Sequence, residues 1–249
     1  KYFALTNFMP IFLERSFTLE IVDNIITCEN VETGEINKKE LKQKYNIPPI
    51  KFTGVIDRVD VNGKNISIID YKSSQSDFSL DSLELGFISQ ILTYALACEM
   101  VFGKNSEDIL GIFYREIAKL GKDLKTYRLR GLANSDLILD DEFYEKAPEI
   151  MYVRTTKAKK IHGADSHKAF TTPELEKLVN KNLENIMKLL EKIFEFDFTL
   201  TNYEIENQYS AEKKTLFNIS SNSDTRLSYK EKVELKPKDL KEKLLNDLK

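Results

Sequence analysis

Two aspartates and a lysine in the stretch FTGVIDRVDVNGKNISIIDYKSS, residues 52–74, are spaced as a catalytic site needs them. Side chains alternate across a strand, so Asp70 and Lys72 point to the same face. Two carboxylates that lie close need a cation between them, or one must hold a proton. If Asp57 joins that face, the paired oxygens suit Mg²⁺ or Mn²⁺, which bind one or two carboxylates and substrate phosphate oxygens. Lys72 would then steady a metal-bound water and stabilise charge that grows on a phosphate.

The turn between the two strands decides the face of Asp57. Asn62-Gly63 is a strong hairpin signal. As a two-residue loop it pairs Val61 with Lys64 and makes Asp57 and Asp70 diagonal neighbours, about 5–8 Å apart. A four-residue loop would pair the two aspartates directly and keep the shared face. A three-residue loop would flip one strand and separate them.

Not every charge in this hairpin serves the same purpose. By strand alternation Arg58 and Asp60 point away from Asp57, and we interpret them as structural. An Asp-Tyr-Lys sequence taken alone also fits a common salt bridge at the end of a strand. The surrounding elements therefore have to decide whether the face is a metal site.

Those elements predict a mixed α/β domain. Residues 17–30 and 50–61 are rich in Thr, Ile, Val and Phe, which is typical of strands, and residues 37–49 favour a short charged helix. A buried helix over 81–102 is expected to begin with a capping box at Asp81 and Glu84 and to end at Gly103. Further along we predict a strand (109–120), a strand followed by a turn (125–139), an exposed loop (155–171), an amphipathic helix (173–196) and a final charged helix.

Composition limits the classes of protein. The chain has 249 residues, 41% hydrophobic and 31% charged, which is typical of an ordered protein. No apolar run approaches the roughly 20 residues of a membrane span, and the first residues lack the features of a signal peptide. A net charge of −3 argues against nonspecific binding of nucleic acid by bulk charge. Cys28 and Cys98 are too few for a four-thiolate site, and we expect reduced, buried thiols in a cytoplasmic protein.

Three motifs in order resemble a known nuclease family. GVIDRVD is followed by IIDYKS and then by Gln90-x-x-x-Tyr94 on the next helix. This combination is similar to RecB-family nucleases of the PD-(D/E)XK superfamily, whose core is a mixed β-sheet flanked by helices. Within it, FMPIFLERSF, GIFYREI and RGLANSDLIL resemble the C-terminal nuclease domain of AddB/RexB-type subunits of helicase–nucleases. The likeness covers residues 8 to about 200.

The resemblance assigns roles to particular positions. Asp57 and Asp70 would bind the metal together with the backbone carbonyl of Tyr71, and Lys72 would be the catalytic lysine. Side chains that would orient the site or touch DNA are Gln90, Tyr94, Ser73 and Arg115. For Gln90 and Tyr94 a buried helix-to-sheet hydrogen-bond pair is an equally open interpretation.

Two residues would support the site. Glu14 matches a family acid upstream of the catalytic motifs, although a surface salt bridge explains it equally well. Gly54 would permit close approach of the backbone, or would merely relieve packing.

The resemblance also implies an activity and a partner. It predicts a Mg²⁺- or Mn²⁺-dependent deoxyribonuclease, an exonuclease that processes DNA ends for double-strand break repair and recombination with a helicase partner of AddA type. AddB-type nucleases commonly carry an iron–sulfur cluster, but residues 203–232 contain no cysteine, so we expect no cluster. We predict a nuclease domain over 1–200, excised from a longer protein, and a tail over 201–249 that packs on it. The alternative is a catalytically silent scaffold of the same fold that binds the helicase or guides a strand.

Other candidate sites are weaker. His162 and His167 are five residues apart in a polar segment, which favours a solvated loop over a metal site. Alternating basic side chains could follow a phosphate backbone, although a solvated strand face is the simpler explanation; they are Lys122, Lys125, Arg128 and Arg130. Tyr114, beside Arg115, could line the same groove as the catalytic motifs. No glycine-rich phosphate loop is present, so an ATP-driven motor must lie elsewhere.

Overall fold

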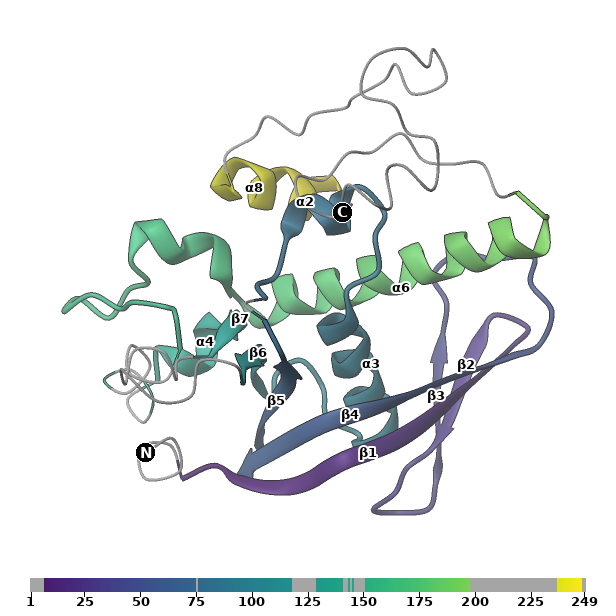
Figure 1. Cartoon of the computed structure of the whole chain (residues 1–249), viewed down its shortest axis with the longest axis horizontal. Helices are drawn as coiled ribbons and strands as arrows, with labels where there is room; N and C mark the ends of the chain where they lie inside the picture. The colour runs from purple at the N-terminus through teal and green to yellow at the C-terminus, as the bar shows by residue number, and fades with distance from the viewer. Residues whose placement is uncertain are drawn as a thin grey trace, which may run out of the picture.

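The computed structural model describes residues 7–74, 76–117, 129–140, 143, 145, 151–197 and 237–247. Within these residues eight strands form one sheet in the order β3-β2-β1-β4-β5-β6-β7-β8. The strands are β1 (Met9–Val22), β2 (Ile25–Glu29), β3 (Ile36–Glu40), β4 (Ile50–Asn62), β5 (Asn65–Lys72), β6 (Ile109–Glu116), β7 (Arg130–Asn134) and β8 (Ala169–Phe170). Figure 1 shows β1 and β4 as a long, bent pair that carries the rest of the sheet.

The sheet is mixed, and its parallel step lies at its centre. The pairs β1–β2, β2–β3, β1–β4 and β4–β5 are antiparallel, whereas β5 and β6 run parallel. A parallel pair needs a crossover, and two helices provide it: α2 (Leu80–Glu84) and α3 (Gln90–Phe102). The residues that follow β5 are therefore carried directly above the sheet.

The helices cover one face of the sheet. Helix α3 contacts β1, β2, β3, β5 and β6, and α6 (Thr172–Phe194) packs on α3. Figure 1 shows α6 running across the molecule above α3. The remaining short elements are α4 (Ser135–Ile138) and the 3₁₀-helix η2 (Gly163–Lys168), and α8 (Pro237–Asp247) contacts α2 and η2. None of the described helices is long and apolar enough to cross a membrane.

Two apolar clusters bury β5 on both faces. The larger lies between the sheet and α3, α6 and α8, and it includes Ile66, Ile68 and both cysteines. The smaller lies on the opposite face around Ile69 and Phe113. A strand buried on both faces is a nearly continuous apolar run, as NISII is here. The charged residues at its end, Asp70 and Lys72, therefore leave a dry strand next to a helix.

The prediction of a charged helix over 37–49 is wrong. Residues 36–40 form β3, which pairs with β2. The side chains of Asn37 and Lys39 reach α3, because Asn37 Nδ2 donates to the carbonyl of Met100 and Lys39 Nζ lies 2.7 Å from a Glu99 carboxylate oxygen. These tertiary contacts override the local helix propensity of the lysines and glutamates.

The single helix predicted over 81–102 is divided into α2 and α3. Ser79, not Asp81, is the N-cap of α2 and accepts a hydrogen bond from the backbone of Ser82, so the predicted capping box is wrong. Gly86 has a φ of 89°, which separates the two helices. The end of α3 at Gly103, in a left-handed conformation, is confirmed.

The later elements follow the predictions more closely. Strand β6 and helix α6 occupy the predicted ranges within a few residues, and Thr171 and Glu174 form a capping box at the start of α6. The predicted loop over 155–171 contains η2 and β8. The predicted domain boundary at residue 200 lies among residues 198–236, outside the described part, while Leu240 and Leu244 of α8 join the larger core cluster.

Candidate active site

The β4–β5 hairpin adopts one of the expected registers, but not the first one. Asn62 pairs with Asn65 and Val61 with Ile66, so the loop is Gly63-Lys64 and the predicted pairing of Val61 with Lys64 is wrong. Gly63 takes a φ of 58°, which leaves Asn62 in the strand. The register is the one expected of a four-residue loop.

This register brings the two aspartates together. Arg58 pairs with Ile69, and the next position along the same ladder sets Asp57 level with Asp70. The Asp57 carboxylate accepts a hydrogen bond of 2.8 Å from the backbone nitrogen of Tyr71. Asp57 is thereby fixed to the very strand that carries Asp70 and Lys72.

Asp70 is a charged group in a dry environment. Only 1% of the residue is exposed, and Lys72 Nζ lies 2.7 Å from its Oδ2 as an ion pair. Although that contact is short, no donor among the described residues is aligned for a hydrogen bond to this oxygen. Burial raises the pKa of Asp70 and the charge of Asp57 raises it further, while Lys72 and the Tyr94 hydroxyl oppose the shift.

Gln90 and Tyr94 on the first turn of α3 continue this polar chain. Lys72 Nζ donates to Gln90 Oε1 at 2.6 Å, and Gln90 Nε2 donates to the Tyr94 hydroxyl at 2.7 Å. Burial, followed by the charges of Asp70 and Asp57, raises the pKa of Tyr94 to about 12. The side chains of β5 and α3 therefore form one connected network from Asp70 to Tyr94.

The opposite face of the hairpin holds a separate charged group. Arg58 and Asp60 make two hydrogen bonds, Nε to Oδ1 at 2.6 Å and NH2 to Oδ2 at 2.8 Å, and Asp60 is fully buried. A third guanidinium nitrogen donates to the Tyr71 hydroxyl at 2.9 Å. Arg58 and Asp60 thus hold Tyr71 from one side, while the Tyr71 backbone holds Asp57 on the other.

The remaining predicted site residues lie at different distances from this network. Ser73 is exposed directly after β5. Arg115 pairs in register with Tyr71, on the face of β6 that is turned away from Asp70. Its neighbour Tyr114 pairs with Asp70 and packs on the α3 side of the sheet.

Glu14 and Gly54 lie on the strands beside Asp57. The neighbours of Glu14, Leu13 and Arg15, pair with Arg58 and Ile56, which places Glu14 level with Asp57. Glu14 is exposed and has a φ of 50°, an uncommon conformation for a residue other than glycine. At Gly54 an added Cβ would lie 2.5 Å from the Phe17 ring, so the ring occupies the space of a side chain.

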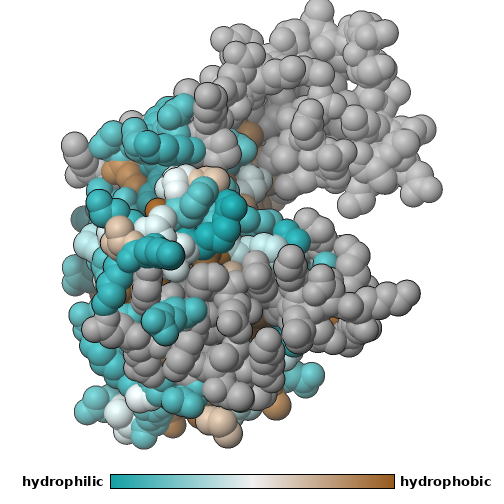
Figure 2. Space-filling view, turned by 90° about the vertical axis from the view of Figure 1, so that its left-hand side faces the viewer, coloured by the Kyte–Doolittle hydropathy of each residue, from teal (hydrophilic) through white to brown (hydrophobic). Residues whose placement is uncertain are grey.

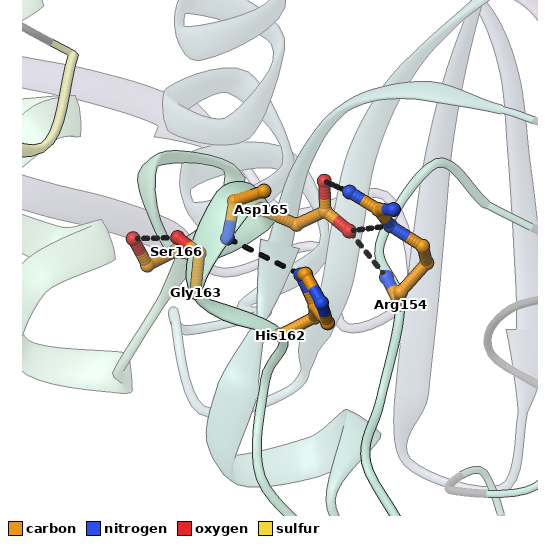
Figure 3. A network of polar contacts seen from close by, with 6 residues as sticks. Arg154, His162, Gly163, Asp165 and Ser166 are labelled. Carbon is orange, nitrogen blue, oxygen red and sulfur yellow. Dashed lines mark hydrogen bonds and ion pairs between the residues drawn. The ribbon is translucent and has the colours of Figure 1, made fainter.

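The two histidines lie outside this site, in the loop shown in Figure 3. Asp165 accepts two hydrogen bonds from the Arg154 side chain and one from its backbone nitrogen. His162 Nδ1 accepts from the backbone of Ala164, which places this ring in the N-cap of η2. Figure 2 shows this side of the molecule, where the described residues are mostly hydrophilic.

Of the four basic residues proposed to follow a phosphate backbone, three lie outside the described residues. Lys122, Lys125 and Arg128 fall in the range 118–128. Arg130 lies on β7, and its guanidinium is 4.2 Å from the centre of the Tyr152 ring.

A clamp on the start of α3 escaped the sequence analysis. Asn182 of α6, which is 1% exposed, accepts from the backbone nitrogen of Ser89 at 2.6 Å and donates to Thr93 Oγ1 at 3.0 Å. Asn185 donates to the carbonyls of Leu83 and Phe87. The only sequence signal was the presence of asparagines at positions where the helical period calls for apolar residues.

A divalent metal fits the donor set on the Asp57 face. Two carboxylates lie level on neighbouring strands, and one of their buried oxygens has no aligned hydrogen bond. Among the described residues no group of three or more His, Cys, Asp or Glu side chains is arranged around a metal position. A metal here would therefore take its other ligands from the main chain, water and substrate, as Mg²⁺ does when it binds through one or two carboxylates.

Comparison with protein families agrees with this geometry. The profile of the PD-(D/E)XK nuclease superfamily matches residues 3–204, which include the hairpin, α3 and α6. The chain belongs to this superfamily. The predicted fold, a mixed sheet flanked by helices, is confirmed by the arrangement of the eight strands and by the family match.

Individual relatives of this nuclease-superfamily chain carry a common name. It is 24% identical over 214 residues to the AddB-type subunit of the ATP-dependent helicase/deoxyribonuclease from a Streptococcus pyogenes serotype M6 strain, a match over 82% of this chain and 19% of that protein. It is 29% identical over 208 residues to the corresponding protein from Carboxydothermus hydrogenoformans, over 72% of this chain and 18% of that protein. The chain therefore spans about one fifth of the length of these relatives, and the predicted resemblance to AddB-type subunits is confirmed.

Proposed function

We propose that this chain is the metal-dependent nuclease domain of an AddB-type helicase–nuclease subunit and that it hydrolyses DNA phosphodiester bonds. The observation that carries the proposal is the shared face of Asp57, Asp70 and Lys72, with Gln90 bonded to the lysine. Two acids and one ammonium leave an excess of negative charge at this face. That excess favours a divalent cation, and the superfamily match makes a phosphodiester the natural substrate.

Each residue of the site would have a defined task. Asp57, Asp70 and the backbone carbonyl of Tyr71 would hold Mg²⁺ or Mn²⁺, which when bound supplies an acidified water and neutralises phosphate charge. Lys72 would steady the attacking water and stabilise the charge on the phosphate oxygens. Gln90 would hold the lysine in place, and Tyr94 would hold Gln90.

The names of the relatives support the choice of substrate and partner. One subunit of a helicase/deoxyribonuclease implies DNA as substrate and a second subunit, which we propose is an AddA-type helicase. A partner that feeds unwound ends would explain why a chain with a net charge of −3 needs little positive charge of its own. We further propose exonucleolytic processing of double-strand breaks in the cytoplasm, without an iron–sulfur cluster.

Degradation of linear single-stranded DNA tests this proposal. The full 249-residue chain is incubated with labelled DNA and Mg²⁺ or Mn²⁺, and Lys72→Ala is compared with Lys64→Ala, which removes an exposed lysine from the turn of the same hairpin. We expect Lys72→Ala to lose at least about a hundredfold in rate, because it removes charge stabilisation at the phosphate. Lys64→Ala should cut DNA at the wild-type rate. Equal activity of the two variants would sink the assignment of Lys72.

A silent scaffold is the less favoured function for this chain. Such a protein gains nothing from an ionised, buried Asp70 beside a second carboxylate, because like charges at short range destabilise the fold. No contact among the described residues relieves this repulsion with a second cation beside Lys72. The scaffold hypothesis predicts no divalent-metal binding that depends on Asp70.

A further inference from the structure

Tyr114 lies beside the proposed catalytic lysine without belonging to any motif that identified the site. It pairs with Asp70 in the parallel register of β5 and β6, so the two side chains share the face turned towards α3. Lys72, two residues after Asp70 on the same face, reaches back over it. The Lys72 ammonium lies 5.6 Å from the centre of the Tyr114 ring, within the range of a cation–π contact.

The Tyr114 ring is itself fixed by the residue that precedes Gln90 at the start of α3. Its hydroxyl forms a hydrogen bond with the Ser89 side chain. Ser89 is the N-cap of α3, yet its side chain makes no capping hydrogen bond. A serine at this position usually caps its own helix, and here its hydroxyl instead links the helix to β6.

The start of α3 is rigid enough to act as an anchor for this contact. The backbone nitrogen of Ser89 is bound by the buried Asn182, and its carbonyl accepts from Thr93 Oγ1 at 3.0 Å. Two consecutive residues at the start of α3 therefore hold both neighbours of the ammonium. Ser89 holds the Tyr114 ring, and Gln90 accepts a hydrogen bond from Lys72.

We infer that Tyr114 is a positioning residue, whose ring holds the Lys72 ammonium in line with the two carboxylates. The inference rests on the proposed role of Lys72 in catalysis. A lysine side chain loses considerable rotamer entropy when it is fixed, so preformed contacts favour one conformation. An aromatic ring supplies such a contact without using an N–H donor. Of the three donors of the ammonium, Asp70 and Gln90 engage two, which leaves one for the substrate.

The chemistry of Tyr114 favours positioning over proton transfer. Burial, with a further contribution from the charge of Asp70, raises the pKa of Tyr114 to about 12. A phenol with so high a pKa stays neutral at pH 7. Its hydroxyl therefore remains a hydrogen-bond partner of Ser89 and does not serve as a base.

Kinetics of three variants test this role. Tyr114→Leu removes the ring, Tyr114→Phe keeps the ring and removes the hydroxyl, and Tyr45→Leu makes the same change at a tyrosine of the core that lies away from the site. We expect kcat of Tyr114→Leu to fall about tenfold to a hundredfold with KM nearly unchanged, because a misplaced catalytic group slows only the chemical step. Tyr114→Phe should stay within about fivefold of wild type. Tyr45→Leu should keep the wild-type kcat at a temperature where all variants are folded.

Two kinetic results would overturn the inference. One is a Tyr114→Leu variant with the wild-type kcat. The other is a Tyr114→Phe variant as slow as Tyr114→Leu, because the ring would then contribute nothing beyond the hydroxyl.

A second measurement does not depend on activity. A double-mutant cycle of Lys72→Met and Tyr114→Leu in urea unfolding reports whether the two side chains interact. We expect the unfolding constants to couple by a factor of about two to five, as is typical of partly exposed cation–π contacts. If the wild-type chain cuts no DNA but this coupling is present, the proposed function fails and the contact stands. If the chain cuts DNA but the coupling is absent, the inference alone fails.

Discussion

The two faces of the β4–β5 hairpin carry charged groups of opposite character. On one face Arg58 and Asp60 satisfy each other through two aligned hydrogen bonds, and a third reaches Tyr71. On the other face one lysine serves two carboxylates, and a buried oxygen of Asp70 has no aligned hydrogen bond. A matched pair belongs to the architecture of the fold, whereas an unbalanced group is prepared for something that arrives later.

The protonation equilibria express the same contrast. Burial alone would lower the pKa of Arg58, yet the hydrogen bonds with Asp60 raise it above its ordinary value. Burial raises the pKa of Asp70, and the nearby Asp57 adds to the shift. The fold therefore stabilises the charge of Arg58 and opposes the charge of Asp70. A fold tolerates such opposition mainly at functional sites.

The largest effect is expected from Asp70→Asn. We expect nuclease activity to fall at least about a hundredfold, because a metal ligand and its charge are removed. Stability at pH 7 without metal should change little or rise, because a raised pKa marks a charge that the fold disfavours. Nuclease assays and urea unfolding on the same preparation check both parts. A large loss of stability would place Asp70 with the structural charges instead.

Asp60→Asn should show the reverse pattern. The substitution leaves the buried Arg58 without its counter-charge, which costs about 3–5 kcal/mol of unfolding free energy. The activity per folded molecule should remain near that of wild type, because Asp60 points away from the metal ligands. Urea unfolding, with activity corrected for the folded fraction, provides the comparison. If Asp60→Asn removed activity from fully folded protein, the division between the two faces would be wrong.

Asn182→Leu asks whether the active face depends on support from outside the hairpin. The change breaks two hydrogen bonds to the start of α3 and leaves buried polar groups unpaired, which costs about 1–3 kcal/mol. Because Gln90 follows directly after Ser89, we expect kcat to fall as well. Asn180→Leu, on the same helix but beyond the clamp, serves as the control. Identical kinetics for the two variants would show that the clamp stabilises α3 without aligning Gln90.

The smallest effect concerns Asp165, an acid whose pKa shifts in the opposite direction from that of Asp70. Burial would raise the pKa of Asp165, but its hydrogen bonds with Arg154 lower it overall. A lowered folded-state pKa gives stability above the unfolded value of about 3.9, and this stability is lost as the pH falls through the folded value. Thermal unfolding of wild type and Asp165→Asn should therefore differ at pH 7 and converge below pH of about 3.9. A constant difference across this range would contradict the assigned shift.

The catalytic face was predictable because it depends mainly on local rules. Strand alternation alone sets Asp70 and Lys72 on one face, and a tight turn confines Asp57 to a few registers. The register itself was not predictable from Asn62-Gly63. Either Gly63 or Asn62 can begin the loop, and only the full ladder selects between them.

The parts that sequence analysis missed depend on contacts between distant segments. Which of Tyr114 and Arg115 faces the site follows from the parallel register of β5 and β6, and no turn between them fixes that register. The strand at 36–40 exists because its side chains reach α3. The clamp of Asn182 on Ser89 joins residues 93 positions apart, and nothing in either local sequence announces the pair.

Calorimetric titration with Mn²⁺ tests the central claim most directly. The full chain is compared with Asp70→Asn and with Asp165→Asn, which removes an acid that lies away from the site. We predict that wild type and Asp165→Asn bind Mn²⁺ equally and that Asp70→Asn shows no binding. Binding to Asp70→Asn as tight as to wild type would contradict the assignment of this face as the metal site.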